Sequence, residues 1–556
     1  MKPTKPHETE ADEREAKALA PAYVPVANFI RRIAHLQGWK RILVALGSGI
    51  LAAGAMPPLN FVPLLFISFP LLIWLCLGRP RGSRIFWNKA FWDGWWWGFG
   101  FFTPTLYWTA ASLFVDIDQF WWMVPFALFG IPAYLALYPG LAVMATRMLF
   151  GERGSLTALS LIFAGFWTLS EYLRGIVFTG FPWASIGYAW SGSALPLVVV
   201  LQSACVFGTL GLGFVTVFAA SLVSGITNKK RPWMILWAPV GVILALMNLG
   251  AAHLLDPPAA TTNITLRIVQ PGASESGSYS SQKAAADFRQ LLALADRPGA
   301  NKIDIQVWPE GAVPTYLNHD AGARQAIAAI LPPQGLVLTG TLSDDAEGRA
   351  YNSVMAVDAT GAIRGVYNKA HLVPFGEYVP LHRYLPFIDA VAGNRFDFST
   401  GPGPRSLDLP GKLPRVGPAI CYEAIFPHAV IDEKQRPRWI VNVTDDGWFG
   451  RTTGPAQHFA IARMRAVEEG LPLVRAANTG ISGVVDSFGR IGPTLALGRV
   501  GVLDAELPPP LPQTLYGRFG NAIPVLMALA STIFGFILLK SWEKYQRRRT
   551  KWQRMT

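Results

Sequence analysis

One cysteine of this chain lies in a polar setting where a thiol could do chemistry. The chain has only three cysteines, and Cys76 and Cys205 lie inside long apolar stretches, where a thiol usually packs as a small hydrophobic side chain. Cys421 instead follows an apolar run and precedes a tyrosine and a glutamate, in the segment VGPAICYEAIFP. Because a thiolate is a strong nucleophile, Cys421 is a candidate for covalent catalysis. A buried structural cysteine is the alternative.

Two further ionisable residues follow strand-like runs. Glu310 comes near the end of IQVWPEGAVP, and Lys369 follows GVYN. Taken singly, each is typical of a solvated or paired charge at a strand end. Sites in open α/β sheets form outside strand ends, so Glu310, Lys369 and Cys421 could converge although 59 and 52 residues separate them. A carboxylate could then accept the thiol proton, and an ammonium could stabilise an oxyanion.

The elements that must position these residues read as an α/β domain. Strand-like runs such as NITLRIVQ and KIDIQVWPE alternate with helix-like runs such as SQKAAADFRQLLALAD between residues 264 and 505. Further on, WIVNVTDDGWF reads as a strand that ends in a turn rich in Asn and Asp, and a helix is expected at 454–469. Such alternation of elements predicts a layered α/β fold.

The rest of the chain is too apolar for an ordinary soluble protein. Hydrophobic residues make up 51% of the chain and charged residues 15%, and the apolar residues concentrate in the first 255 residues and near the C-terminus. A bilayer core of about 30 Å requires roughly 20 apolar residues per helix. The predicted spans are residues 41–57, 60–78, 91–114, 119–144, 156–178, 195–224, 233–254 and 519–539.

Lysine and arginine gather between alternate predicted spans. The formal net charge is +13, a value that in a soluble protein would suggest a nucleic-acid partner. Here the basic residues flank spans, as in 79–89 and in the tail 540–556, whereas 179–195 carries no charge. The positive-inside rule then places both termini in the cytoplasm and the α/β domain in the periplasm of a Gram-negative bacterium. We therefore expect a multi-pass inner-membrane protein with no nucleic-acid partner.

The motifs around the three candidate residues resemble those of the nitrilase superfamily, in which WPE, YNK and CYE carry a Glu-Lys-Cys triad. NVTDDGWFG, FGEYVP and GPAQHFAIARMRAVEEGLPLVRAANTGISGVVDSFG resemble, within that superfamily, its membrane-bound branch, the apolipoprotein N-acyltransferase family, as does EYLRGIVFTGFPW in the membrane part. The resemblance implies Glu310 as general base, Lys369 as oxyanion partner and Cys421 as nucleophile. It also implies an αββα sandwich placed between the seventh and eighth of eight transmembrane helices.

The resemblance divides the chain into regions and predicts what surrounds them. The expected regions are a cytoplasmic segment at 1–40, a membrane domain of seven helices at 41–254, a nitrilase-like catalytic domain at 264–505, a linker at 506–518, an eighth transmembrane helix at 519–539 and a basic cytoplasmic tail at 540–556. The histidines lack metal-ligand spacing, and no phosphate-binding glycine loop is present. We therefore expect no metal, no cofactor and a monomer.

The resemblance also points to supporting residues in the catalytic domain. It implies that Glu377 orients Lys369 or handles the proton of an incoming amine, and a loop salt bridge is the alternative. Tyr422 and Glu423 match residues that the family needs, and Glu423 either supports the Cys421 loop or touches substrate. Asn442 and Trp448 are weaker candidates, because an Asn or Trp at the end of a buried strand is commonly structural.

One stretch departs from the family pattern. After the first strand the family usually carries a tryptophan, whereas this chain reads VQPGASESGSYS, with Tyr279 nearest that place. Tyr279 is therefore the candidate for donor or acceptor recognition.

The family resemblance implies transfer of a phospholipid acyl chain, through a cysteine thioester, to the α-amine of a diacylglyceryl-cysteine lipoprotein. A membrane-tethered amidase or hydrolase is the alternative, since the same triad can pass its acyl group to water. The aromatic and aliphatic segment 374–391 favours a lipid substrate. A binding or transport protein is a remote alternative. Charged residues within spans can mark a transport pathway, and Glu171 and Arg174 are such residues. They lie three residues apart, however, so they can pair with each other on one helix.

Overall fold

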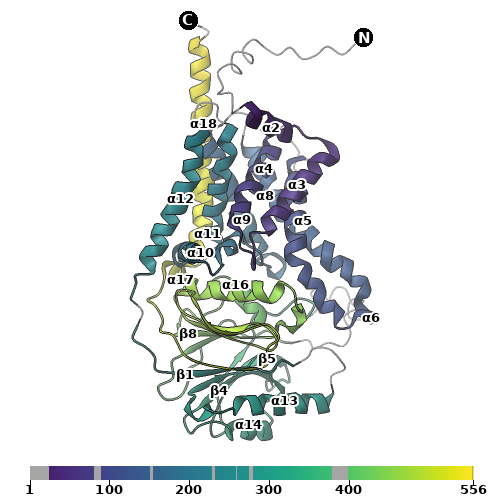
Figure 1. The fold of residues 1–556 in the computed structure, drawn as a ribbon, viewed down its shortest axis with the longest axis vertical. Helices are drawn as coiled ribbons and strands as arrows, with labels where there is room; N and C mark the ends of the chain where they lie inside the picture. Colours follow the sequence, from purple (N-terminus) through teal and green to yellow (C-terminus); the bar gives the residue numbers. More distant parts are fainter. Residues whose placement is uncertain are drawn as a thin grey trace.

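The chain forms a helical body and an α/β body, which lie one above the other in Figure 1. The structure is a computed structural model, and it describes residues 24–79, 89–150, 154–227, 232–257, 259–273, 280–378, 398–553 and 555. Tyr279 and most of the aromatic and aliphatic segment 374–391 lie outside the described residues. Helix α2 and the C-terminal part of α18 lie at the end of the molecule away from the sheets.

The helical body is built from apolar helices. Its α-helices are α2 (Val24–Ala34), α3 (Gly38–Ala53), α4 (Leu65–Leu77), α5 (Lys89–Leu106), α6 (Ile117–Phe120), α7 (Ile131–Leu135), α8 (Leu137–Leu149), α9 (Leu156–Arg174), α10 (Leu195–Leu201), α11 (Ala204–Leu222), α12 (Pro232–His253), α17 (Leu515–Phe519) and α18 (Ala522–Gln553).

Within the described residues, four helical stretches are long and apolar enough to cross a membrane: Ile117–Leu149, Leu156–Arg174, Ala204–Ile226 and Ala522–Thr550. Shorter apolar helices lie at Val62–Leu77 and Trp237–His253. Each of these six stretches overlaps a predicted span. The total of eight spans stays a prediction.

Aromatic packing and glycine contacts hold the helices of this body together. The Trp97 ring lies 5.4 Å from Phe69 and 5.0 Å from Trp167, measured between ring centroids. A Cβ at Gly49 would lie 2.0 Å from a backbone oxygen of α5, and one at Gly100 would lie 2.2 Å from a backbone oxygen of α3. Small residues at such crossings allow two helix backbones to approach closely. The crossing of α3 and α5 therefore requires glycine on both sides.

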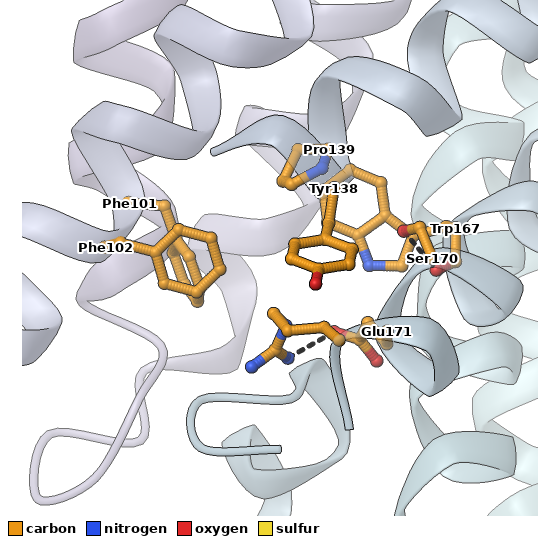
Figure 2. Close-up of a pocket in the computed structure, with 8 residues that line it drawn as sticks. Phe101, Phe102, Tyr138, Pro139, Trp167, Ser170 and Glu171 are labelled. Carbon is orange, nitrogen blue, oxygen red and sulfur yellow. Dashed lines mark hydrogen bonds and ion pairs between the residues drawn. The ribbon is translucent and has the colours of Figure 1, made fainter. Parts of the chain in front are cut away.

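The predicted charged pair of α9 lies next to a small pocket of the helical body. Arg174 Nη2 lies 3.9 Å from Glu171 Oε1, and Figure 2 shows Glu171 near Tyr138 and Trp167 on the pocket wall. Arg174 donates to the carbonyl of Phe181 at 2.7 Å, and Glu171 accepts from the backbone N–H of Ile186 at 3.0 Å. The pair therefore holds the uncharged connection after α9 in place.

The α/β body consists of two stacked sheets. The larger sheet has the order β12-β1-β2-β4-β5-β6 with β3 beside β4, and the smaller has the order β11-β10-β9-β8-β7. The strands are β1 (Thr265–Gln270), β2 (Ile305–Val307), β3 (Val313–Tyr316), β4 (Leu336–Asp344), β5 (Ala350–Asp358), β6 (Ile363–Asn368), β7 (Val416–Ile420), β8 (Trp439–Thr444), β9 (Leu473–Ala477), β10 (Ser482–Val485), β11 (Ile491–Leu495) and β12 (Gly501–Glu506).

Helices cover the outer faces of both sheets. One core joins the sheets through residues such as Ile268 and Val354 on the larger and Val441 and Val474 on the smaller. Helices α13 (Ser281–Ala295) and α14 (Ala321–Ala328) cover the larger sheet, and α16 (Gly454–Glu469) covers the smaller. Helix α16 lies between the sheets and the helical body. These layers form the αββα sandwich that the sequence analysis expected.

Candidate active site

The three candidate triad residues follow the ends of three strands, as predicted. Glu310 comes three residues after the end of β2, Lys369 directly follows β6, and Cys421 directly follows β7. Strands β2 and β6 belong to the larger sheet and β7 to the smaller. The site therefore forms where the two stacked sheets end side by side.

Lys369 lies at the centre of this cluster. Its side chain is fully buried, and Nζ lies 3.2 Å from Glu310 Oε1 and 2.9 Å from Glu377 Oε1. The amide of Asn352 on β5 donates to both of these oxygens, at 2.8 and 2.7 Å. Burial opposes the charged form of Lys369, but the two carboxylates outweigh it and raise the pKa of the ammonium. Lys369 is therefore a permanent cation beside two carboxylates.

Glu310 is held from several sides. Its Oε2 accepts from the backbone N–H of Asp445 at 2.9 Å, while Oε1 faces Lys369 and Asn352. The backbone of Glu310 rests on Gly340 of β4, where a Cβ would lie 2.4 Å from the Glu310 Cα. This close approach needs glycine at position 340, and it fixes the position of the Glu310 backbone relative to β4.

Cys421 sits at a sharp turn between strand and helix. Its φ is +48°, a left-handed conformation that side chains other than glycine rarely adopt and that is often found at functional sites. The residue is buried, and it begins the short 3₁₀-helix η11 (Cys421–Ile425). Burial raises the pKa of the thiol well above its usual range, Glu310 raises it further, and Lys369 only partly opposes them. The surroundings of Cys421 therefore favour the protonated thiol over the thiolate.

Glu423 ties the Lys369 segment to the Cys421 segment. Its Oε1 accepts from the Tyr367 hydroxyl at 2.8 Å and from the backbone N–H groups of Ala370 and His371 at 2.6 and 3.1 Å. Its Oε2 accepts from the backbone N–H of Ile420 at 2.7 Å. A carboxylate has about four acceptor positions, and these contacts fill them. The geometry is that of a support for the two segments.

Both carboxylate oxygens of Glu377 likewise accept hydrogen bonds from protein donors. Its Oε1 lies beside Lys369 and Asn352, and its Oε2 accepts from the backbone N–H of Val373 at 2.8 Å. The carboxylate therefore joins the Lys369 ammonium to the loop that follows it.

Tyr422 connects the turn at Cys421 to the helical body. Its hydroxyl donates to the carbonyl of Gly180 at 3.1 Å. The chain around this contact is unusual, since Phe178 and Thr179 have φ values of +51° and +75°. The residue next to Cys421 thus contacts the connection that follows α9.

Helix α16 makes a polar, buried contact with the helical body. Gln457 accepts from the indole N–H groups of Trp108 and Trp183 at 3.0 and 2.7 Å. Glu468 accepts from both the backbone N–H and the hydroxyl of Thr209, each at 2.7 Å. Polar pairing of this kind specifies one relative position of two packed surfaces. The active-site turn is therefore positioned together with the helical body.

The remaining predicted residues are Asn442, Trp448 and Tyr279. Asn442 on β8 donates to the carbonyl of Ala419 at 2.9 Å and pairs with Arg475, so it joins strands of the smaller sheet. Trp448 is 38% exposed on the turn that follows β8. Tyr279 lies outside the described residues.

Sequence reasoning missed two polar residues that the structure brings to the site. Asn352 bridges Glu310 and Glu377, and its only signal in the sequence is a polar residue at a buried position of a strand. His458 lies beside Cys421, with Nε2 3.1 Å from the carbonyl oxygen of that residue. Its signal is a histidine on the apolar side of a helix, and only the packing of α16 shows which atom it meets.

Comparison with known proteins gives consistent matches along the chain. Residues 48–222 match the apolipoprotein N-acyltransferase N-terminal domain, and residues 265–514 match the carbon-nitrogen hydrolase domain. Curated proteins named apolipoprotein N-acyltransferase are similar over most of their length. The chain is 42% identical to one from Rhodopseudomonas palustris (90% of this chain, 96% of the relative). It is 40% identical to one from Bradyrhizobium diazoefficiens (89% and 94%) and 36% identical to one from Brucella melitensis (94% and 99%). The chain belongs to the apolipoprotein N-acyltransferase family.

Proposed function

We propose that the chain transfers an acyl group from a phospholipid to the α-amine of the N-terminal diacylglyceryl-cysteine of apolipoproteins, through a thioester on Cys421. The observation that carries this proposal is the cluster in which the buried Lys369 ammonium contacts Glu310 and Glu377, with Cys421 close enough to interact electrostatically with Glu310 and Lys369. Relatives of that name cover nearly the whole chain, helical body included. The apolar helices support a membrane location, where phospholipid is at hand.

The first half-reaction forms the thioester. The Cys421 thiol gives its proton to the Glu310 carboxylate, and Sγ attacks the ester carbonyl of the phospholipid. The oxyanion that develops is stabilised by the Lys369 ammonium and by the backbone N–H of Tyr422, each such donor contributing about 3 to 4 kcal/mol. The carbon–oxygen bond of the ester then breaks, and the proton on Glu310 passes to the departing lysophospholipid oxygen. Cys421 is left acylated.

The second half-reaction transfers the acyl group. The neutral α-amine of the lipoprotein attacks the thioester carbonyl, and the same donors stabilise the second oxyanion. The carbon–sulfur bond breaks, Glu310 accepts a proton from the nitrogen, and that proton returns to the Cys421 sulfur. One product leaves before the other substrate reacts, so the kinetics are ping-pong. The contacts of Glu377 support a role in orienting Lys369.

The same proposal places the chain in the bacterial inner membrane. Eight spans with both termini in the cytoplasm would put the α/β body in the periplasm, where lipoprotein acceptors are exposed. The basic segments between alternate predicted spans support this orientation. The regions 1–40, 41–254, 264–505, 506–518, 519–539 and 540–556 then follow as proposed, and the protein acts as a monomer.

The test is an assay with the full chain in proteoliposomes. Phospholipid with a labelled acyl chain is mixed with a synthetic diacylglyceryl-cysteine lipopeptide, and the products are identified by mass spectrometry. We expect one lysophospholipid for each lipopeptide that gains an acyl group, no product with Cys421→Ala and normal product with Cys205→Ala. Free fatty acid without acylated lipopeptide would show a hydrolase, and product from Cys421→Ala would refute the thioester route.

A further inference from the structure

The buried side chain of His458 contacts the nucleophile turn but has no part in the proton transfers described above. It lies on α16, and its Nε2 is 3.1 Å from the carbonyl oxygen of Cys421. Its Nδ1 is 2.8 Å from Asp446 Oδ1. A second carboxylate oxygen of Asp446 accepts from Arg475 at 2.7 Å, and the exposed fraction of all three side chains is zero. Arg475, Asp446 and His458 thus form a buried chain of polar contacts, and His458 at its end contacts the carbonyl of Cys421.

We propose that His458 is a positioning residue that orients the Cys421–Tyr422 peptide group so that the Tyr422 N–H faces the oxyanion. The proposal rests on the acyl transfer proposed above, because it concerns the oxyanion of that reaction. A trans peptide group is planar, so its C=O and N–H point in opposite directions. Fixing the carbonyl of Cys421 therefore fixes the direction of the next N–H.

The layers of the fold give that direction. Helix α16 covers the outer face of the smaller sheet, whereas Glu310 and Lys369 come from the larger sheet on its inner side. The Cys421 carbonyl points toward α16, where His458 binds it. The Tyr422 N–H then points toward the side on which Glu310 and Lys369 lie. This is where a tetrahedral intermediate on Cys421 would carry its negative oxygen.

The proposal assigns a proton to Nε2 of the imidazole ring. A carbonyl oxygen only accepts, so the bond to Cys421 needs an N–H at Nε2. Nδ1 lies near an acceptor, Asp446 Oδ1, and near a donor, Arg475 Nη2 at 3.1 Å. With the proton on Nε2 alone, Nδ1 accepts from Arg475, and with both nitrogens protonated, Nδ1 donates to Asp446. The ring itself is held by Trp183, whose centroid lies 5.5 Å away.

The turn at Cys421 makes this anchoring necessary. With a φ of +48°, the residue occupies a conformation that an L side chain rarely adopts. A peptide group at such a turn can rotate to a less strained arrangement unless both sides are held. The Glu423 carboxylate holds the N–H of Ile420 before the turn, and His458 holds the carbonyl after it. The two anchors together fix the turn.

The test compares His458→Gln with His458→Asn in the full-length chain. The side-chain nitrogen of glutamine can reach the place of Nε2, whereas that of asparagine reaches only the place of Nδ1. Two rates are measured: acyl transfer, and modification of Cys421 by methyl methanethiosulfonate, which involves no carbonyl oxyanion. We expect His458→Asn to lower kcat by about 10²-fold, the effect of losing one oxyanion donor. KM and the modification rate should stay within about twofold of the unmodified chain, and His458→Gln should recover most of the lost kcat.

Several outcomes would overturn the proposal. An equal fall in both rates for His458→Asn would mean that the histidine supports the fold or the thiol in general. Full kcat in His458→Asn, or no recovery in His458→Gln, would mean that the N–H at Nε2 is not needed. Each variant is also assayed on a p-nitrophenyl ester, whose hydrolysis forms an oxyanion too. If the unmodified chain cleaves this ester but acylates no lipopeptide, the proposed function is refuted and the ester assay still tests His458. If the unmodified chain is inactive on both substrates, both proposals are refuted.

Discussion

Replacing Glu423 by glutamine tests whether this carboxylate supports the active site or binds substrate. In the structure Oε1 accepts from three donors and Oε2 from the backbone N–H of Ile420. A glutamine can place its oxygen at only one of these positions. If that oxygen takes the place of Oε1, the NH₂ group faces the N–H of Ile420, and one buried hydrogen bond is lost. Such a bond to a charged group contributes about 1.5 to 3 kcal/mol.

The expected result of Glu423→Gln is a loss of both stability and rate. For a domain of 150 to 250 residues, about 1.5 to 3 kcal/mol lowers the unfolding midpoint by about 3 to 12 °C. The change also loosens the residue before Cys421, and misplacement of a reacting group by about 1 Å costs roughly 10²-fold in rate. We therefore expect a lower kcat with an unchanged KM for phospholipid.

The assay combines thermal unfolding in detergent with acyl-transfer kinetics in proteoliposomes. Glu347→Gln serves as the matched control, because Glu347 lies in the same body with a side chain that is 65% exposed and pairs with Arg349 at the surface. Surface pairs of this kind contribute little, so the control should behave like the unmodified chain. An unchanged midpoint together with a raised KM in Glu423→Gln would refute the reasoning and would place the carboxylate in contact with substrate.

Three further changes test other parts of the structure. Gly340→Ala should lower kcat strongly, because the new Cβ would push the Glu310 backbone away. Gly365→Ala is the control and should have a nearly normal kcat, because the nearest atoms to its Cβ would be Leu407 side-chain atoms at 3.4 Å or more. Equal rates for the two variants would contradict the account. Gln457→Leu leaves two buried indole N–H groups unpaired. It should lower the free energy of unfolding by about 2 to 6 kcal/mol and with it the unfolding midpoint. An unchanged midpoint would count against the contact. Although burial opposes its charged form, neighbouring Arg and His side chains hold the pKa of Asp446 at about 2, below its unfolded value of about 3.9. Ionised Asp446 therefore stabilises the fold above about pH 4, and the stability difference between the unmodified chain and Asp446→Asn should shrink as the pH falls from about 4 to 2; a constant difference would refute this.

The strand ends made the core of the site predictable from the sequence. Glu310 and Cys421 each follow a buried apolar strand, and Lys369 follows the partly exposed strand β6. The structure brings Glu310 and Lys369 within 3.2 Å of each other. Asn352 was not predictable, because its contact with both carboxylates depends on the register of β5 against β4 and β6. His458 was not predictable either, because its partner is a backbone carbonyl on another element. Local patterns show strands and ends, but not which atoms meet across layers.

The membrane part shows the same limit. The predicted span 195–224 is divided into α10 and α11, and the predicted span 91–114 leaves the α-helical form after Leu106. Glycine and proline interrupt these segments: Gly208 has a φ of +65° inside α11, and Pro104 lies near the end of α5. Hydropathy predicts where apolar chain is concentrated, but it does not predict where the backbone bends.

The central claim is that Cys421 carries the acyl group, and intact mass measurement tests it most directly. Purified protein is incubated with phospholipid and no acceptor, beside Cys421→Ala, and each sample is measured before and after hydroxylamine, which cleaves thioesters. We predict a mass increase of one acyl chain that needs Cys421 and disappears with hydroxylamine. No adduct under conditions where a lipopeptide still becomes acylated would contradict the account, because the acyl group would then pass directly from phospholipid to amine.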